Sequence, residues 1–291
     1  MHNKNHGKSV TLDAQVAEEK DEGIVPTLAV RENLSVSHIT SSAFFARNSF
    51  DIEKSYNKKA PEEIPEEVRI AYWAYGIGSV FSAVAFLDAT INEVFRDAVD
   101  MQSGIVTLLD SKVVESMAQL WTEEKPIKNW DGFKTLINAL ISSLTSNKKD
   151  KYRQRVERWP VLDKYQLTLY LAKKRRFDKN SLSWESADAL ISFRHFLVHY
   201  KPGWIIAAAP PGKDEGPEDK ETAKLEKKLK DYKICPNSLY PGAIFPYTCL
   251  GWKGANWAVE ASLKFTDEFF NTMSLKPNYT NLRHLLNTKK I

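Results

Sequence analysis

The run from Ile70 to Leu87 constrains the fold of this chain most, because its 18 residues include no charged side chain. Pro65, followed by Glu66 and Glu67, favours a helix that begins just before the run, since carboxylates stabilise the positive end of a helix. The helix continues to about Gln102. A run of this length nearly spans a bilayer, but tyrosines and serines dilute it. We therefore expect a long helix that its neighbours bury, with a membrane span as the less favoured alternative.

The rest of the chain repeats apolar residues at helical spacing. No stretch shows the alternation of apolar and polar residues that marks a strand. Several helices joined by mostly short links favour an all-α fold, an up-and-down helical bundle. The helices expected after the first one cover residues 105–121, 130–144, 162–177, 184–200, 219–232 and 255–273.

Changes in composition divide the chain into three parts. Residues 1–60 are polar and charged, so we expect a flexible N-terminal arm, tethered to the body by the patch Ala43-Phe44-Phe45. The bundle covers residues 61–275, and within it residues 205–250 form a Pro/Gly-rich and charged insertion. Residues 276–291 form a polar tail that we expect to be loose.

The composition favours a cytoplasmic protein. No apolar run of a secretory signal begins the chain. The net charge of +4 permits an anionic partner without requiring one. Cys235 and Cys249 belong to no CxxC pair, so we expect two thiols, with an isolated disulfide as the alternative. Because glycine-rich phosphate loops and HExxH are absent, we expect neither a cofactor nor a metal.

One short stretch, Arg194-His195-Phe196-Leu197-Val198-His199-Tyr200, carries the residues best suited to chemistry. It ends the expected helix 184–200, because the following Lys201-Pro202-Gly203-Trp204 contains a helix-stopping proline and glycine. His195 and His199 are four residues apart and share one helix face. The helix end therefore presents a fixed cation together with two groups that exchange protons near neutral pH.

The pattern Arg194-His195-x3-His199 resembles the signature of the HEPN superfamily, whose ribonucleases carry arginine, a polar residue, three further residues and histidine. The stretch from Ala85 to Glu93 also resembles the first long helix of bacterial HEPN-like proteins, and the resemblance in layout extends from about Pro65 to Met273. It implies a metal-independent endoribonuclease that pairs two such helices in a homodimer. Many such enzymes are toxins or antiviral defence effectors, so RNA, a second copy of the chain and an antitoxin or regulatory protein are the expected partners.

The residue types suit cleavage of RNA by its own 2′-hydroxyl. His199 is the expected general base or acid, and Arg194 is expected to bind the phosphate through two parallel N–H groups. His195 would orient the substrate or share the proton transfer, while Tyr200 and Lys201 would support it. Arg194 and His199 are about 140° apart on an ideal helix, so a single helix does not aim both at one atom, which favours the homodimer.

Two other interpretations stay open. A histidine beside an apolar helix face is commonly a core residue that has a hydrogen-bond partner, and an arginine is commonly half of a surface ion pair. A non-catalytic HEPN-like module that binds nucleotide, RNA or a protein partner is the second alternative. Three polar residues of the first helix, Asp88, Asn92 and Glu93, either hold Arg194 or His199 in place, or cap a turn or pair with Arg96.

Two basic clusters leave the same choice between RNA contact and a solvated surface. The first is Lys148 to Arg158, and the second is Lys173-Lys174-Arg175-Arg176, which would end the expected helix 162–177. Cations in the last turn of a helix are stabilised by its dipole, so the second cluster by itself does not require a ligand.

Overall fold

The computed structural model describes residues 33–100, 105–122, 155–200 and 220–289, together with the backbone of two two-residue strands. The strands, β1 (Ala14–Gln15) and β2 (Ala29–Val30), pair antiparallel, with Ala14 opposite Val30. All other regular elements of the described residues are helices or 3-10 turns, which confirms the all-α fold class. The α-helices are α1 (Leu34–Tyr56), α2 (Glu66–Asp100), α3 (Ser111–Thr122), α5 (Val161–Leu171), α6 (Leu182–Val198), α7 (Lys220–Asp231) and α8 (Trp252–Met273), and the 3-10 turns are η1 (Pro61–Glu63), η2 (Ile105–Leu108), η4 (Val156–Arg158), η5 (Tyr247–Cys249) and η6 (Thr280–Leu286).

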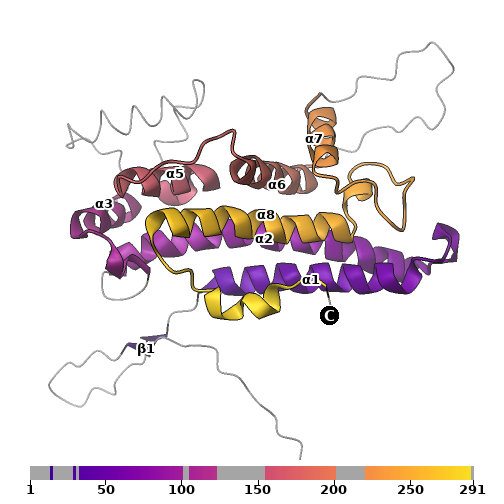
Figure 1. Cartoon of the computed structure of the whole chain (residues 1–291), viewed down its shortest axis with the longest axis horizontal. Coiled ribbons are helices and arrows are strands. Elements are labelled where there is room, and N and C mark those ends of the chain that lie inside the picture. The colour runs from indigo at the N-terminus through magenta and orange to yellow at the C-terminus, as the bar shows by residue number, and fades with distance from the viewer. Residues whose placement is uncertain are drawn as a thin grey trace, which may run out of the picture.

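Helix α2 is the centre of the bundle. It packs against α1 on one side and against α8 on another, and α3, α5 and α6 also contact it (Figure 1). The helix begins and ends within two residues of the expected bounds, 65 and 102. It is long and apolar enough to span a membrane, but 44% of its most apolar window is buried inside the protein, and the core helix of a bundle has the same composition.

Small side chains let α1, α2 and α8 approach closely. Ser79 of α2 donates to Ser42 O of α1 and lies 3.0 Å from Ala255 O of α8, so one hydroxyl joins three helices. A Cβ atom on Gly76 would lie 2.2 Å from the Leu250 carbonyl oxygen, where no other side chain fits. The crossing of the three helices therefore depends on residues with little or no side chain.

The expectation of a flexible arm over residues 1–60 is wrong for residues 34–56, which form α1. Ile39, Ala43 and Ala46 of this helix have no exposed surface. Phe44 is half exposed, whereas the Phe45 ring stacks on Tyr75 of α2. The patch expected to tether an arm is part of a core helix, because Ala43 is fully buried and α1 packs against α2.

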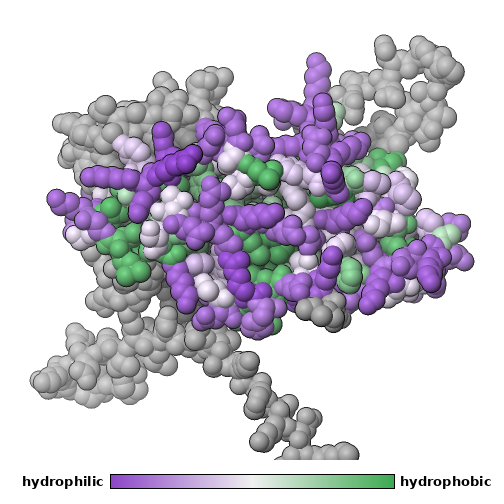
Figure 2. All heavy atoms as spheres, viewed as in Figure 1, coloured by the Kyte–Doolittle hydropathy of each residue, from purple (hydrophilic) through white to green (hydrophobic). Residues whose placement is uncertain are grey.

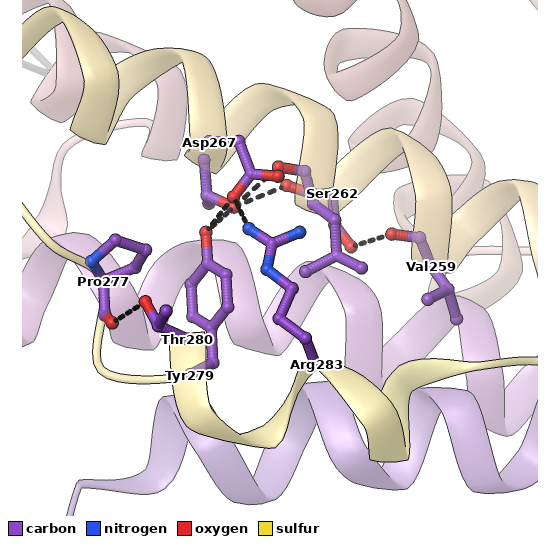
Figure 3. Close-up of polar contacts among 9 residues, drawn as sticks. Val259, Ser262, Asp267, Pro277, Tyr279, Thr280 and Arg283 are labelled. Atoms are coloured by element: carbon purple, nitrogen blue, oxygen red, sulfur yellow. Dashed lines mark hydrogen bonds and ion pairs between the residues drawn. The ribbon is translucent and has the colours of Figure 1, made fainter.

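The expected loose tail is also wrong as far as Lys289, because η6 docks on the bundle (Figure 3). Tyr279 is fully buried, and its hydroxyl donates to Asp267 Oδ1 of α8 at 2.8 Å. The same carboxylate accepts from Arg283, so the two residues fix η6 to α8. Arg47 of α1 donates to the carbonyl oxygens of Leu285 and Asn287, so η6 is also held to α1.

The region between α2 and α6 differs from expectation in its boundaries. The helix expected at 105–121 is divided into η2 and α3, and the helix expected at 162–177 ends at Leu171, where α5 stops. The helix expected at 130–144 lies outside the described residues, as does most of the first basic cluster.

The insertion contains α7, as expected, and then an irregular segment from Tyr232 to Gly251. Cys235 and Cys249 are joined by a disulfide that closes this segment, so the expectation of two thiols is wrong. Asn237 holds the segment from within, since its side-chain oxygen accepts from the backbone of Leu239 and Tyr240. Tyr247 packs against Trp73 of α2, with 4.5 Å between ring centroids. These contacts place the segment against α2 beside the carboxyl-terminal end of α6.

Candidate functional site

Helix α6 positions the arginine and the two histidines. Ser181 caps its amino terminus by accepting from Trp184 N, and Phe193 is buried in the core. The last residue of the helix is Val198, and the backbone N of His199 still donates to His195 O at 3.0 Å. His199 is therefore held by the final helical hydrogen bond at the point where the chain leaves the helix.

The two histidines lie together, whereas the arginine packs on α2. His195 and His199 are exposed, with 4.4 Å between their ring centroids. Arg194 is half-buried, and its guanidinium carbon lies 5.6 Å from the centre of the Phe81 ring of α2. One turn of helix thus presents two adjacent imidazoles to solvent, with a cation beside them over an aromatic face. The interpretation of the histidines as packed core residues does not fit this exposure.

Among the residues that the structure describes, neither imidazole has a hydrogen-bond partner. A catalytic base is usually oriented by a third group that receives its other N–H. Tyr200 is 48% exposed, and its ring packs against Phe196 rather than against a histidine. Lys201 lies outside the described residues.

The disulfide-closed segment packs against the helix turn that carries the motif. Phe245 packs against Phe196 with 4.9 Å between ring centroids, and against Phe193 with 6.1 Å. Phe245 also lines a cavity of about 420 Å³ that reaches the disulfide at Cys235 and α7 at Lys230. Of the described residues that line this cavity, none belongs to the motif.

Asp88 and Asn92 of α2 do not hold the motif. Lys164 of α5 donates to Asp88 Oδ1 at 2.7 Å and to Asn92 Oδ1 at 2.6 Å. The lysine is 1% exposed, and its third proton goes to Glu157 O. Neither of the two expected roles is correct, because a buried ammonium needs these oxygens and Arg96 pairs with Asp100 instead.

Glu93 caps α1 rather than serving the motif. Its carboxylate accepts from Ser35 N at 2.8 Å and from Ser35 Oγ at 2.6 Å, and Asn278 also donates to it. Burial raises the pKa of the Glu93 carboxyl above its ordinary value, while the hydrogen bonds from Ser35 oppose that rise. The three polar residues of α2 therefore join the helices of the bundle.

Sequence reasoning missed two features of the structure, the buried Lys164 and the packing of Phe245 on α6. Lys164 is the one lysine among the mostly apolar residues Leu162 to Leu171, and a lysine in such a run is the signal that could have indicated a buried ion pair. Phe245 has no such signal, because its approach to α6 depends on the folding of a segment without regular structure.

Within the described ranges, no group of three metal-ligating side chains comes together. Comparison of the chain with protein-family models, with curated proteins and with solved structures gives no match.

Proposed function

We propose that this protein is a metal-independent endoribonuclease of HEPN type. The observation that carries the proposal is the pair of exposed imidazoles, with 4.4 Å between ring centroids, on the same end of α6 as Arg194. One imidazole would take the proton of the RNA 2′-hydroxyl and another would protonate the leaving 5′-oxygen. The guanidinium would stabilise the charge that gathers on the phosphate. The products would be a 2′,3′-cyclic phosphate and a 5′-hydroxyl.

The site would be completed by a second copy of the chain. Arg194 packs toward α2 whereas the histidines point to solvent, so one protomer does not converge all three groups on one phosphate. Val198, on the last turn of α6, is 42% exposed and offers an apolar contact beside the motif. A two-fold axis near this turn would bring two motifs to one cleft. In this role the protein would act in the cytoplasm, as a toxin or defence effector under the control of an antitoxin or regulatory protein.

Cleavage of a defined RNA in excess EDTA tests the activity. The wild type should cut, whereas Arg194→Ala and His199→Ala should lose about 10²-fold or more in rate, as expected for loss of a charge-stabilising donor or an acid–base group. His284→Ala is the matched control, because His284 is an exposed histidine on η6, on the other side of the bundle from α6 (Figure 1). Circular dichroism and sedimentation confirm that each variant is folded.

Val198→Glu tests the homodimer, since a charge at the two-fold contact should give monomers and abolish cutting. Leu182→Glu is the control, because Leu182 is 67% exposed at the other end of the same helix. A wild type that is monomeric at the concentration at which it cuts would exclude the shared cleft.

A non-catalytic HEPN-like module that binds nucleotide, RNA or a protein partner is the second candidate. It is favoured by the lack of an orienting partner for either imidazole among the described residues. Folded wild type that binds RNA but leaves it intact in both EDTA and Mg²⁺ would select this candidate.

A further inference from the structure

The connection between α5 and α6 carries four consecutive cations, Lys173, Lys174, Arg175 and Arg176, which we call the basic turn. All four residues are exposed. Among the described residues, no carboxylate pairs with any of them. Four adjacent like charges repel one another, and this repulsion is not offset by a neighbour within the described part of the chain.

The helix dipole does not account for the basic turn. Helix α5 ends at Leu171, so the four cations follow the helix, and the effect of the dipole falls off within the last turn. Lys173 also adopts a left-handed conformation, with φ of 52°, at a position where glycine is the usual residue. A lysine in this conformation costs about 1 kcal/mol of strain, and a turn with no role beyond structure would avoid that cost by having glycine there.

Both ends of the basic turn are fixed to the core. On the α5 side, Lys173 N donates to Tyr170 O and Lys174 N donates to Leu169 O. On the α6 side, the buried Gln166 donates to Phe177 O at 3.0 Å and accepts from Phe177 N at 3.1 Å. The Phe177 ring stacks on Phe265 of α8 at 4.5 Å. The backbone that carries the cations is therefore ordered before any ligand arrives, which lowers the entropic cost of binding.

We propose that the basic turn binds the phosphate backbone of the RNA that the motif cuts at the other end of α6. This inference rests on the proposed ribonuclease function and extends it to the size of the substrate. The 17 residues of α6 span about 25 Å. A stacked strand has one phosphate per about 3.4 Å, so roughly seven phosphates separate the two sites. The substrate is thus an RNA strand of that length or more, rather than a nucleotide or a dinucleotide.

Helix α7 also presents hydrophilic side chains to solvent, where it projects from the bundle (Figure 2). Two of its five lysines differ from those of the basic turn, because Lys228 pairs with Asp188 of α6 and Lys230 pairs with Glu226. Partly neutralised lysines on a helix are the ordinary solvated surface. The four cations of the basic turn are therefore the stronger candidate for contact with an anionic chain.

The test is equilibrium binding of a 2′-O-methyl RNA of about 12 nucleotides, which cannot be cut, over a range of salt concentrations. Each phosphate contact contributes about 0.7 to the slope of log K against log salt for a single strand. Changing all four residues of the basic turn to Gln should therefore flatten the slope by about 3. An all-ribose oligonucleotide of about 3 nucleotides is too short to reach from the motif to the turn, so the rate at which the motif cuts it should be the same in both proteins.

A matched variant separates local contact from net charge. Its substitutions to Gln also remove four exposed cations, which lie at the carboxyl end of α1, just after α1, and after α8: Lys54, Lys58, Lys59 and Lys276. The proposal predicts an unchanged slope for this control. Equal flattening in both variants, an unchanged slope in the basic-turn variant, or absence of binding by the wild type would overturn it. Cleavage of the all-ribose oligomer is measured separately. A protein that binds RNA through the basic turn but does not cut it would refute the proposed ribonuclease function and leave the RNA contact standing.

Discussion

Lys164 Nζ of α5 lies 2.7 Å from Asp88 Oδ1 of α2, although the two residues are 76 positions apart in the chain. The lysine is 1% exposed, whereas the aspartate side chain is 46% exposed. Loss of the aspartate and loss of the lysine should therefore lower the stability of the protein by different amounts. A carboxylate at the surface can be hydrated when its partner is lost, but a buried ammonium cannot.

Asp88→Asn should accordingly cost more stability than Lys164→Met. The first change leaves a buried charge without its counter-ion, at about 3 kcal/mol, while the second replaces the ammonium by an apolar chain of similar length. Urea unfolding of the two variants and of the double variant measures the difference. A larger loss in Lys164→Met would show that the aspartate, rather than the lysine, needs the pair.

Asp88→Asn also tests whether the pair of Lys164 and Asp88 is independent of the motif. Because Asp88 and Asn92 contact Lys164, folded Asp88→Asn should keep RNA cleavage within about threefold of the wild-type rate at a temperature where both are native. A loss comparable with that of His199→Ala would mean that the carboxylate does support the motif. Cleavage and far-UV circular dichroism on the same samples distinguish these outcomes.

Gly76→Ala tests the close approach of α2 to the segment that precedes α8. The added methyl group would meet the Leu250 carbonyl at 2.2 Å, which is backbone and cannot rotate away. Overpacking of this kind costs about 1–3 kcal/mol, so the midpoint of urea unfolding should fall. Gly242→Ala is the control, because nothing lies within 4 Å of its added methyl group. Equal stability of the two variants would show that the helices readily move apart.

The disulfide gives a third stability prediction. Cys235 and Cys249 close a loop of 14 residues, for which loop-closure entropy predicts about 3 kcal/mol. The double variant Cys235→Ser, Cys249→Ser should lose about that much stability and should no longer respond to dithiothreitol. Thermal unfolding of both proteins with and without the reductant measures the effect. A wild type that melts at the same temperature in both conditions would contradict a formed disulfide.

Sequence patterns predicted the helices that repeat apolar residues at helical spacing. Helices α2, α6, α7 and α8 lie close to their expected bounds, since proline and apolar spacing mark their ends. Helix α1 was not predicted, because its buried face contains serines and alanines, such as Ser42 and Ala43. These small side chains contribute to packing by letting α2 approach. A pattern based on hydrophobicity gives no weight to that face.

Contacts between distant segments were beyond sequence reasoning. The ion pair between Lys164 and Asp88 and the packing of Phe245 on Phe196 join segments that only the tertiary fold brings together. The end of α6 was predictable because it follows from local chemistry, namely helical spacing and a Pro-Gly stop.

Glu93 gives a prediction for the dependence of stability on pH. Burial raises the pKa of its carboxyl above the ordinary value of 4.5, so the folded state keeps a proton that the unfolded state has released. The stability contributed by this proton is complete below about pH 4.5 and is lost as the pH rises through the raised pKa of the folded state. The stability of the wild type relative to Glu93→Gln, which has no proton to lose, should therefore fall as the pH rises above 4.5.

Ser35→Ala sharpens the test at Glu93. The Ser35 hydroxyl donates to Glu93 Oε2 and opposes the rise in its pKa, so removing the hydroxyl should raise the pKa further. The loss of stability with rising pH should then extend to a higher pH in Ser35→Ala than in the wild type. Urea unfolding at closely spaced pH values and constant ionic strength, for the wild type, Glu93→Gln, Ser35→Ala and the double variant, measures both effects. A stability difference that stays constant or grows with pH would show that hydrogen bonding from Ser35 outweighs burial at this carboxyl.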